Sequence, residues 1–346
     1  MVRGKRSIAS LWSTGFTLEH RVSLPMLALA AVVSVSVWLT AEASLGQFTH
    51  PASAQMQLAS RIMQAASQVA RAEKRERGLL QPIEVDPNQT GLIGPEFTDI
   101  TTSLGVLEAK RTATNPDLAA ALTARIAEFD LPEDSVVVAL FSGSMVGANV
   151  AALAATQALG LETVIVSSLG ASMFGATDPD FTWLDIEAAL RAGGATTGRS
   201  DIALIGGNGA VGRGLSEEGL AAIRASIARS GVPLLEAETL PELLGELEAR
   251  IDELTGKKPA LFINAGGSVA AFGTCQNANL IPAGLSHTRL HCADGMPGLI
   301  VSMSQRDVPV VHLLNMRGLA ADWGLPYDPI PFDLPGNNVF VYGSGH

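Results

Sequence analysis

The sequence predicts an α/β fold whose mainly parallel, doubly wound sheet is covered by helices on both faces. An unbroken apolar run, 136–141, is typical of a strand buried on both sides of a parallel sheet. A nearly uncharged stretch rich in alanine, 146–159, predicts a helix packed against the sheet, and a second apolar run, 163–166, completes a βαβ unit. Apolar runs and helical patterns then continue to alternate, which is typical of a parallel sheet.

Composition limits the classes of function. The 346 residues are 47% hydrophobic and only 16% charged, so the chain can bury a large core in one large or two modest domains. The net charge of -11 argues against nucleic acid as a partner and against electrostatic attachment to anionic lipid, because both require clustered Lys and Arg.

The N-terminal segment predicts a membrane anchor. Residues 22–41 carry no charge, and a helix of that length rises roughly 30 Å, enough to cross the hydrocarbon core of a bilayer. Four basic residues precede it, so 1–21 is expected in the cytoplasm and the rest of the chain outside. The alternative is a signal peptide cleaved after Ala43, because Ala41-Glu42-Ala43 is a small-residue cleavage site. The apolar regions of such peptides span only about 7–15 residues, which favours the uncleaved anchor.

A juxtamembrane region, 42–110, follows the predicted anchor. Its first part, 52–80, has helical apolar spacing and a charged end, which predicts a stalk or docking helix. Its second part, 86–105, is dense in Pro, Gly, Thr and Asn but also contains apolar residues that can pin it down. We therefore expect an ordered loop there.

The extracytoplasmic α/β domain is expected at 111–331, with a C-terminal tail at 332–346. The first helix of the domain, 118–129, follows Asp117, whose carboxylate is available to the first-turn amides. Beyond the central βαβ unit, the predicted helices are 183–191, 216–230, 241–254, 299–306 and 316–323, and the predicted strands are 202–205, 232–235, 260–264 and 308–314.

Small and hydroxyl-bearing residues follow the predicted strands. Because the carboxyl ends of parallel strands meet at one edge of a sheet, we expect these residues to line one pocket, with His312 or Asn315 at its border. Loops of this composition present N–H and hydroxyl donors that can hold carboxylates without Lys or Arg. The candidate ligand-binding residues are Ser142, Gly143, Ser144, Ser168, Ser172, Gly207, Asn208, Gly209, Asn264, Gly266, Gly267 and Ser268.

A serine nucleophile is the alternative interpretation of the same loops. Ser144 is the candidate and His312 the candidate base, because a serine on a tight strand-to-helix turn can be activated by a nearby imidazole. The sequence FSGSMVG departs from the G-x-S-x-G pattern, since Ser142 and Val146 stand at the two glycine positions. A helix-capping or ligand-holding role is therefore favoured for Ser144.

The segment 207–212 matches the G-x-G-x-x-G pattern of dinucleotide sites and follows a predicted strand. The next helix is predicted to begin only near Ser216, so a pyrophosphate would not lie at its N-terminus. We therefore expect a glycine-rich turn that binds another anion or only reverses the chain, and we expect no cofactor. A nucleotide or phosphosugar enzyme is the weaker alternative.

Two further motifs concern metal and redox chemistry. His287 and His291 have a spacing that zinc sites use, but the prolines and glycines around them disfavour a helix, so we expect no metal site. Cys275 and Cys292 are the only cysteines, and thiols outside the cytoplasm tend to be oxidised. We therefore expect a disulfide that closes the loop between them.

Several long motifs carry a family resemblance. They are DPNQTGLIGPEFTDITTSLG, LEAKRTATNP, FSGSMVGANVAAL, SSLGASMFGATDPDFTWLDIE, NAGGSVAAFG and PVVHLLNMRGLAADWGLP. Together with the N-terminal span, they resemble the bacterial poly-gamma-glutamate system protein family over nearly the whole chain, from the predicted anchor to about Pro331. That family is associated with the machinery that makes and exports poly-gamma-glutamate, alongside a cytoplasmic ligase and small membrane subunits.

The resemblance implies a pathway and no catalytic residues. The implied protein is a single-pass membrane protein with a cytoplasmic N-terminus and an extracytoplasmic main domain. It would be an accessory factor for poly-gamma-glutamate, as capsule or released polymer, binding the carboxylate-bearing polymer or the partner membrane subunits. The alternative is a hydrolase or transferase that acts on gamma-glutamyl bonds with a serine nucleophile.

Overall fold

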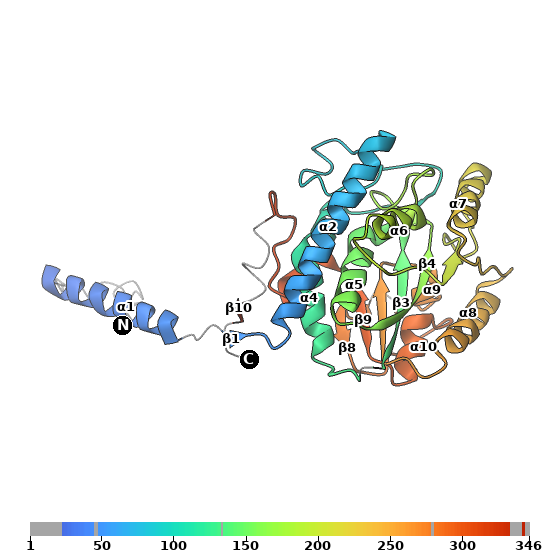
Figure 1. Cartoon of the computed structure of the whole chain (residues 1–346). Coiled ribbons are helices and arrows are strands. Elements are labelled where there is room, and N and C mark those ends of the chain that lie inside the picture. The colour runs from blue at the N-terminus through green and yellow to red at the C-terminus, as the bar shows by residue number, and fades with distance from the viewer. Residues whose placement is uncertain (1–22, 45–47, 133, 278–279, 333–340, 343–346) are drawn as a thin grey trace, which may run out of the picture. The chain divides into compact units, whose positions relative to one another are not determined.

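The computed structural model describes residues 23–44, 48–132, 134–277, 280–332 and 341–342 (Figure 1). The chain divides into two units, Met1–Phe48 with Gly343–His346, and Thr49–Tyr342. The predicted cytoplasmic segment, 1–21, and most of the predicted tail lie outside the described residues.

The segment predicted as an anchor coincides with helix α1 (Leu24–Ser44). In the part of the chain that the structure describes, no helix is both long and apolar enough to cross a membrane. The predicted transmembrane span at 22–41 is therefore not confirmed.

The second unit is built on a six-stranded sheet with the strand order β6-β4-β3-β7-β9-β8. All neighbours pair in parallel except β8 and β9, which are antiparallel. The predicted α/β class with a mainly parallel sheet is thus confirmed. The strands are β3 (Val136–Ser142), β4 (Glu162–Ser168), β6 (Ile202–Leu204), β7 (Leu261–Ala265), β8 (Gly284–Ser286) and β9 (Val310–Leu313). The predicted strand 232–235 is reduced to one bridge between Ala203 and Leu234.

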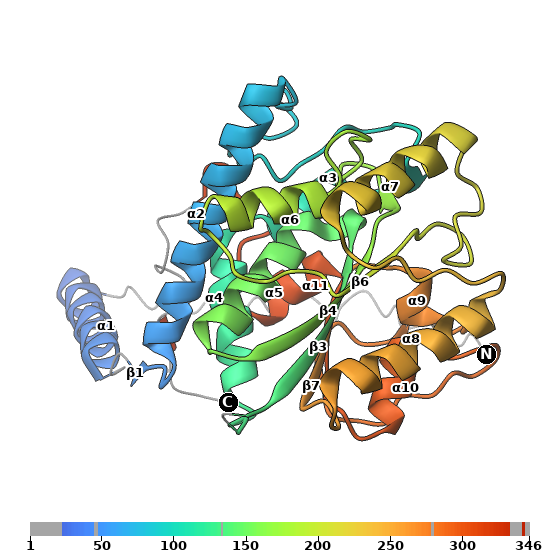
Figure 2. The ribbon, with the colours of Figure 1, turned by 45° about the vertical axis from the view of Figure 1, so that its right-hand side comes forward.

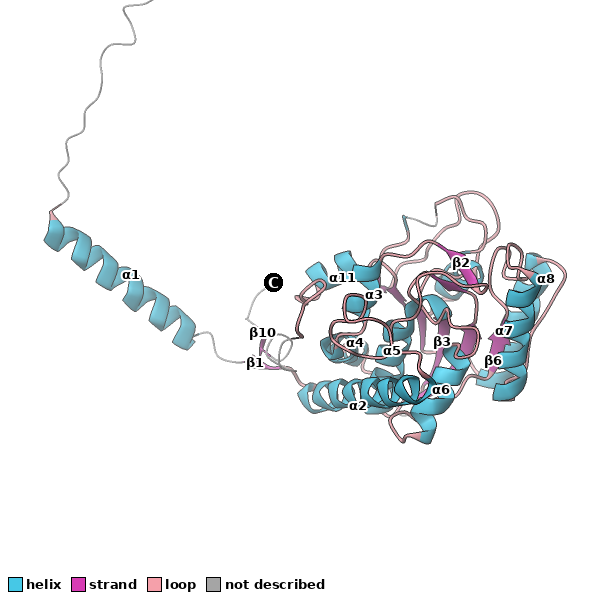
Figure 3. Ribbon diagram, turned by 90° about the horizontal axis from the view of Figure 1, so that it is seen from above, coloured by secondary structure: helices cyan, strands magenta, loops and turns pink. Residues whose placement is uncertain are grey.

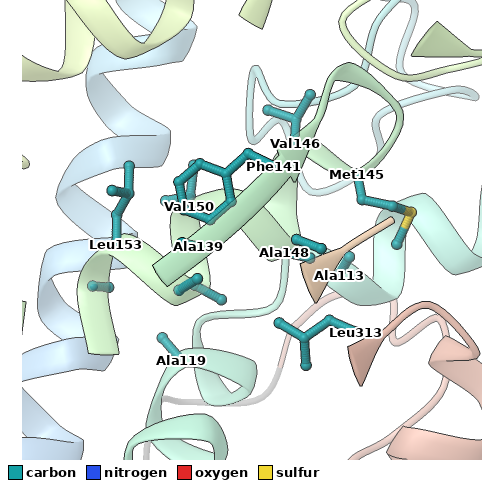
Figure 4. Packing of buried hydrophobic residues seen from close by; sticks show 14 of the residues in the cluster. Ala113, Ala119, Ala139, Phe141, Met145, Val146, Ala148, Val150, Leu153 and Leu313 are labelled. Carbon is teal, nitrogen blue, oxygen red and sulfur yellow. The ribbon is translucent and has the colours of Figure 1, made fainter. Parts of the chain in front are cut away.

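Helices cover both faces of this sheet, as Figure 2 shows for α4 and α5 on one side and α8 and α10 on the other. Strand β3 explains why, because its residues alternate between two separate hydrophobic clusters. Val137, Ala139 and Phe141 belong to one cluster, and the residues between them to the other. In Figure 4, Phe141 lies among the side chains that β3 and α5 contribute to the first cluster. An apolar run without alternation is therefore what this central strand requires.

The helices follow the predicted pattern closely. They are α2 (Ser53–Arg77), α3 (Leu107–Ala113), α4 (Pro116–Ala127), α5 (Val146–Ala158), α6 (Trp183–Ala192), α7 (Glu217–Ser230), α8 (Leu240–Thr255), α9 (Val269–Phe272), α10 (Leu299–Gln305) and α11 (Met316–Asp322). The short helices α3 and α9 lie in segments for which no helix was predicted.

The predicted juxtamembrane helix, α2, is packed into the α/β unit. Met56, Met63 and Ala66 are fully buried in the same cluster as residues of α4 and α5. The region 42–110 thus contributes to the compact unit Thr49–Tyr342 from its eighth residue onward. The buried residues of α2 form a stripe along the whole helix, so its apolar spacing reflects packing in the hydrophobic core.

The loop after α2 reaches the edge of the sheet. Strand β2 (Thr101–Ser103) pairs in parallel with the short strand β5 (Ala171–Ser172), so the predicted ordered loop 86–105 is held beside the residues that follow β4. Seen from above in Figure 3, β2 lies apart from the strands β3 and β6 of the main sheet. The two remaining short strands, β1 (Phe48–Thr49) and β10 (Val341–Tyr342), lie outside the main sheet.

Candidate functional site

The carboxyl ends of the parallel strands converge as predicted. Ser142, the last residue of β3, stands opposite Ser168, the last residue of β4, and Ser168 in turn stands opposite Leu204, the last residue of β6. On the other side, Phe141 stands opposite Ala265 at the end of β7. The loops that follow these four strands therefore leave the sheet at one edge.

A cavity of about 310 Å³ lies at this edge, and we call it the polar cradle. Seven of the predicted ligand-binding residues line it: Ser142, Ser144, Ser168, Gly207, Asn208, Gly267 and Ser268. The structure adds Thr102, Ser103, Gly170 and Val269 to the lining. The other predicted residues do not line the cavity: Gly143, Gly209 and Gly266 lie in the turns after the strands, Asn264 lies in β7, and Ser172 lies in β5.

The turn after β3 is shaped by hydrogen bonds of its own serines. The Ser142 hydroxyl accepts from the Ser144 N–H at 3.1 Å and begins a single 3₁₀ turn, Gly143–Met145. A Cβ on Gly143 would lie 2.5 Å from the carbonyl oxygen of Leu169, so this position requires glycine. The Ser144 hydroxyl accepts from the Ser172 N–H at 2.9 Å, which leaves the Ser144 hydroxyl proton available to a ligand.

Backbone donors complete the polar cradle. Within the described residues, the N–H groups of Gly207, Gly267 and Ser268 have no hydrogen-bond partner. Gly207 has a φ of +73°, a left-handed conformation that glycine adopts without strain. Successive amides in such loops form concave donor sites that bind anions.

Lys110 supplies a positive charge that the loops themselves lack. Its Nζ reaches from α3 to the carbonyl oxygen of Ser144 and lies 2.6 Å from the Ser172 hydroxyl. Only 6% of the residue is exposed, and burial lowers the pKa of Lys110 to about 7. Among the described residues, no Asp or Glu forms an ion pair with it. The sequence did not point to Lys110, because it is 34 positions away from Ser144.

A second cavity, of about 540 Å³, adjoins the polar cradle at Gly267, and we call it the apolar pocket. Its other lining residues are Phe272, Leu280, Ile281, Pro282, Ala283, His312, Leu314 and Asn315. His312 and Asn315, predicted at the border of the site, are thus found here. Ser144 and His312 line different cavities, and the described residues show no hydrogen bond between them. The predicted Ser144–His312 pair therefore has no geometric support.

The glycine-rich segment 207–212 forms tight turns with several positive φ angles. Helix α7 begins at Glu217, and its N-terminal cap is the Ser216 hydroxyl, which accepts from the Gly219 N–H. A pyrophosphate on this loop would therefore not meet the helix N-terminus, in agreement with the sequence argument. The loop contributes Gly207 and Asn208 to the polar cradle.

The two remaining motifs are the histidine pair and the two cysteines, and none of these residues lines the apolar pocket. His287 follows β8 without entering a helix, and its ring contacts Phe129 in a tilted arrangement with 4.7 Å between ring centroids. Within the described residues, no three His, Cys, Asp or Glu side chains are grouped as a metal site. The predicted disulfide between Cys275 and Cys292 is confirmed, with Cα atoms 5.2 Å apart.

Comparison of the chain with protein-family models, curated proteins and solved structures finds no match.

Proposed function

We propose that the polar cradle binds carboxylate groups, and that the protein is an accessory factor of poly-gamma-glutamate synthesis or export. The motifs described in the sequence analysis supply the pathway, and the donors of the polar cradle supply the chemistry. In this proposal, the carboxylates belong to the polymer or to partner membrane subunits.

The buried amine of Lys110, which has no acidic partner among the described residues, is the observation that carries the proposal. Removing an ammonium group from water costs several kcal/mol unless an anion and hydrogen bonds compensate it. Lys110 has two oxygen partners but no acidic one in the described residues. Lys110 does not itself line the polar cradle, but its Nζ contacts the carbonyl oxygen of Ser144, which does. A carboxylate held by Ser144 and the free N–H groups of Gly267 and Ser268 would therefore lie near the amine and favour its charged form.

The proposal places the α/β unit outside the cytoplasm, attached to the membrane through the N-terminal segment. The disulfide supports this location, because such bonds persist in oxidising compartments. Sequencing the mature N-terminus tests the attachment. A chain that begins at Ser44 would instead be a secreted protein.

Binding is tested by titrating the full chain with glutarate, a small dicarboxylate, by calorimetry. We expect saturable binding that Ser144→Ala weakens about 3- to 10-fold, the value of one hydrogen bond of about 0.5–1.5 kcal/mol. Ser302→Ala is the matched control, because Ser302 lies in α10 and does not line the polar cradle. Absence of glutarate binding to the unmodified chain would refute the proposal.

A second candidate function is hydrolysis or transfer of gamma-glutamyl bonds. The observation that favours it is the 2.6 Å contact between Lys110 Nζ and the Ser172 hydroxyl. With a pKa of about 7, part of the amine is neutral near pH 7 and can accept the proton of a serine nucleophile. Incubation with the polymer tests it: chain shortening that is lost in Ser172→Ala, or in Ser144→Ala, would show catalysis and identify the serine.

A further inference from the structure

The apolar pocket contains a buried imidazole whose protonation state is set by its neighbours. His312 is 3% exposed, and its Nδ1 lies 2.9 Å from Asn264 Nδ2. The same Nδ2 donates to the carbonyl oxygen of Gly266 at 2.7 Å, which fixes the orientation of the amide because a carbonyl can only accept. Asn264 Nδ2 is therefore the donor to Nδ1, and the proton of the neutral ring lies on Nε2.

The Nε2–H group of His312 is available to a ligand in the pocket. Within the described residues this group has no hydrogen-bond partner, although the residue is almost completely buried and lines the cavity. The ring makes an edge contact with Phe272, which lines the same cavity. The Nε2–H group is accessible from the cavity, so a ligand that brings an acceptor can form a hydrogen bond with it there.

The remaining walls define what kind of acceptor fits. Burial lowers the pKa of His312 to about 4, so the ring is neutral near pH 7. Phe272, Ile281 and Leu314 provide apolar surface, and the described residues that line the pocket include no Lys or Arg. An anion would lose its hydration without gaining a counter-charge. An uncharged carbonyl flanked by methylene groups loses little water and gains a hydrogen bond.

We propose that the apolar pocket is a subsite for an uncharged amide carbonyl and its flanking methylene groups, in a ligand whose carboxylate occupies the polar cradle. The inference rests on the proposed function, because it assigns the second half of the same ligand. Gly267 lines both cavities, so a chain that leaves the polar cradle on that side enters the apolar pocket. The site then selects a carboxylate joined to an amide over a simple carboxylate.

The test compares two ligands on the full chain, glutarate and γ-glutamylglutamate, which adds an amide linkage to the carboxylates. His312→Phe keeps an aromatic ring against Phe272 and removes the Nε2–H donor. We expect it to weaken γ-glutamylglutamate about 3- to 10-fold, the value of one neutral hydrogen bond, and to leave glutarate within about twofold. Ser302→Ala, in α10 and outside both cavities, should change neither affinity.

A spectroscopic readout keeps the test independent of the stability of that variant. In the unmodified protein, the ¹⁵N and ¹H resonances of the His312 Nε2–H should shift on addition of γ-glutamylglutamate and stay unchanged with glutarate. Equal losses for both ligands in His312→Phe, or no loss, or an unshifted imidazole, would overturn the inference while the carboxylate site stands. If neither ligand binds the unmodified chain, the proposed function itself is refuted, and the subsite with it.

Discussion

The polar cradle and the apolar pocket lie side by side at one edge of the sheet, but different kinds of side chain line them. The polar cradle consists of hydroxyls and backbone N–H groups with the Lys110 ammonium behind them. The apolar pocket is lined mainly by aromatic and aliphatic side chains, together with Gly267, Asn315 and one neutral imidazole. The first arrangement suits an anion, and the second suits an uncharged group. The contrast indicates that the site recognises two different chemical groups of one ligand.

Lys110→Met should separate the two cavities most strongly. The substitution removes the buried amine that contacts the Ser144 carbonyl oxygen behind the polar cradle, and hydrogen bonds to charged groups contribute about 1.5–3 kcal/mol. We expect glutarate affinity to fall about 10- to 150-fold by calorimetry. The chain should remain folded, because an apolar side chain of similar length replaces a buried charge.

Lys74→Met is the matched control for that substitution. Lys74 is also buried, with its Nζ 2.8 Å from the carbonyl oxygen of Ile93. Burial lowers the pKa of Lys74 to about 8, while Asp86 and Asp178 act in the opposite direction. The residue does not touch the polar cradle, so its loss should leave glutarate affinity unchanged. An equal effect of both substitutions would mean that Lys110 acts only through stability.

The pH dependence of binding should report the same lysine. A bound carboxylate raises the pKa of Lys110 above its value of about 7 in the free protein. Glutarate affinity is therefore expected to be highest below pH 7 and to decrease as the pH rises above 7, by up to the loss seen in Lys110→Met. Calorimetry between pH 6 and pH 9 checks this, and a flat profile would contradict it. Lys110→Met should abolish the dependence.

The stability of the free protein should show the opposite trend with pH. The folded-state pKa of Lys110, about 7, lies below the ordinary lysine pKa of 10.5, so the unfolded chain binds more protons between these values. The cost of burying the charge is fully present below pH 7, and the contribution of Lys110 to the free energy of unfolding increases as the pH rises from about 7 to 10.5. Urea unfolding of the protein and of Lys110→Met measures this difference. A difference that is constant with pH would contradict the assigned shift.

Loss of the disulfide should affect the apolar pocket more than the polar cradle. Leu280, Ile281 and Pro282 belong to the loop that Cys275 and Cys292 close, and they form one wall of the pocket. Replacing both cysteines by serine should lower the free energy of unfolding by about 2–4 kcal/mol. It should also weaken γ-glutamylglutamate by up to about 10-fold, bringing it close to glutarate. Ligand affinities measured well below the unfolding midpoint check this, and an equal change for both ligands would contradict it.

The sequence predicted those elements whose own periodicity and composition identify them. The apolar run of β3 and the uncharged helix α5 follow from periodicity and composition alone. Strand β8 was not predicted because its three residues lie in a segment rich in proline and glycine, and they form a strand only by pairing with β9. The sequence also did not predict that α2 is buried in the α/β unit, since an amphipathic pattern indicates that a helix packs against something but not which element it packs against.

The sequence alone was enough to predict much of the polar cradle. Ser142, Ser168 and Ser268 could be grouped because parallel strands place their carboxyl ends together whatever the intervening helices do. Only the tertiary structure brought in Lys110 and Thr102, which reach the site from α3 and β2, 34 and 69 positions away from the residues they contact. It also decided the tautomer of His312, because the Asn264 amide that sets it is 48 positions away on the neighbouring strand. The sequence predicts a parallel sheet, and in such a sheet the carboxyl ends of the strands meet at one edge. Contacts between side chains that are distant in sequence depend on how whole elements pack together, which the sequence does not show.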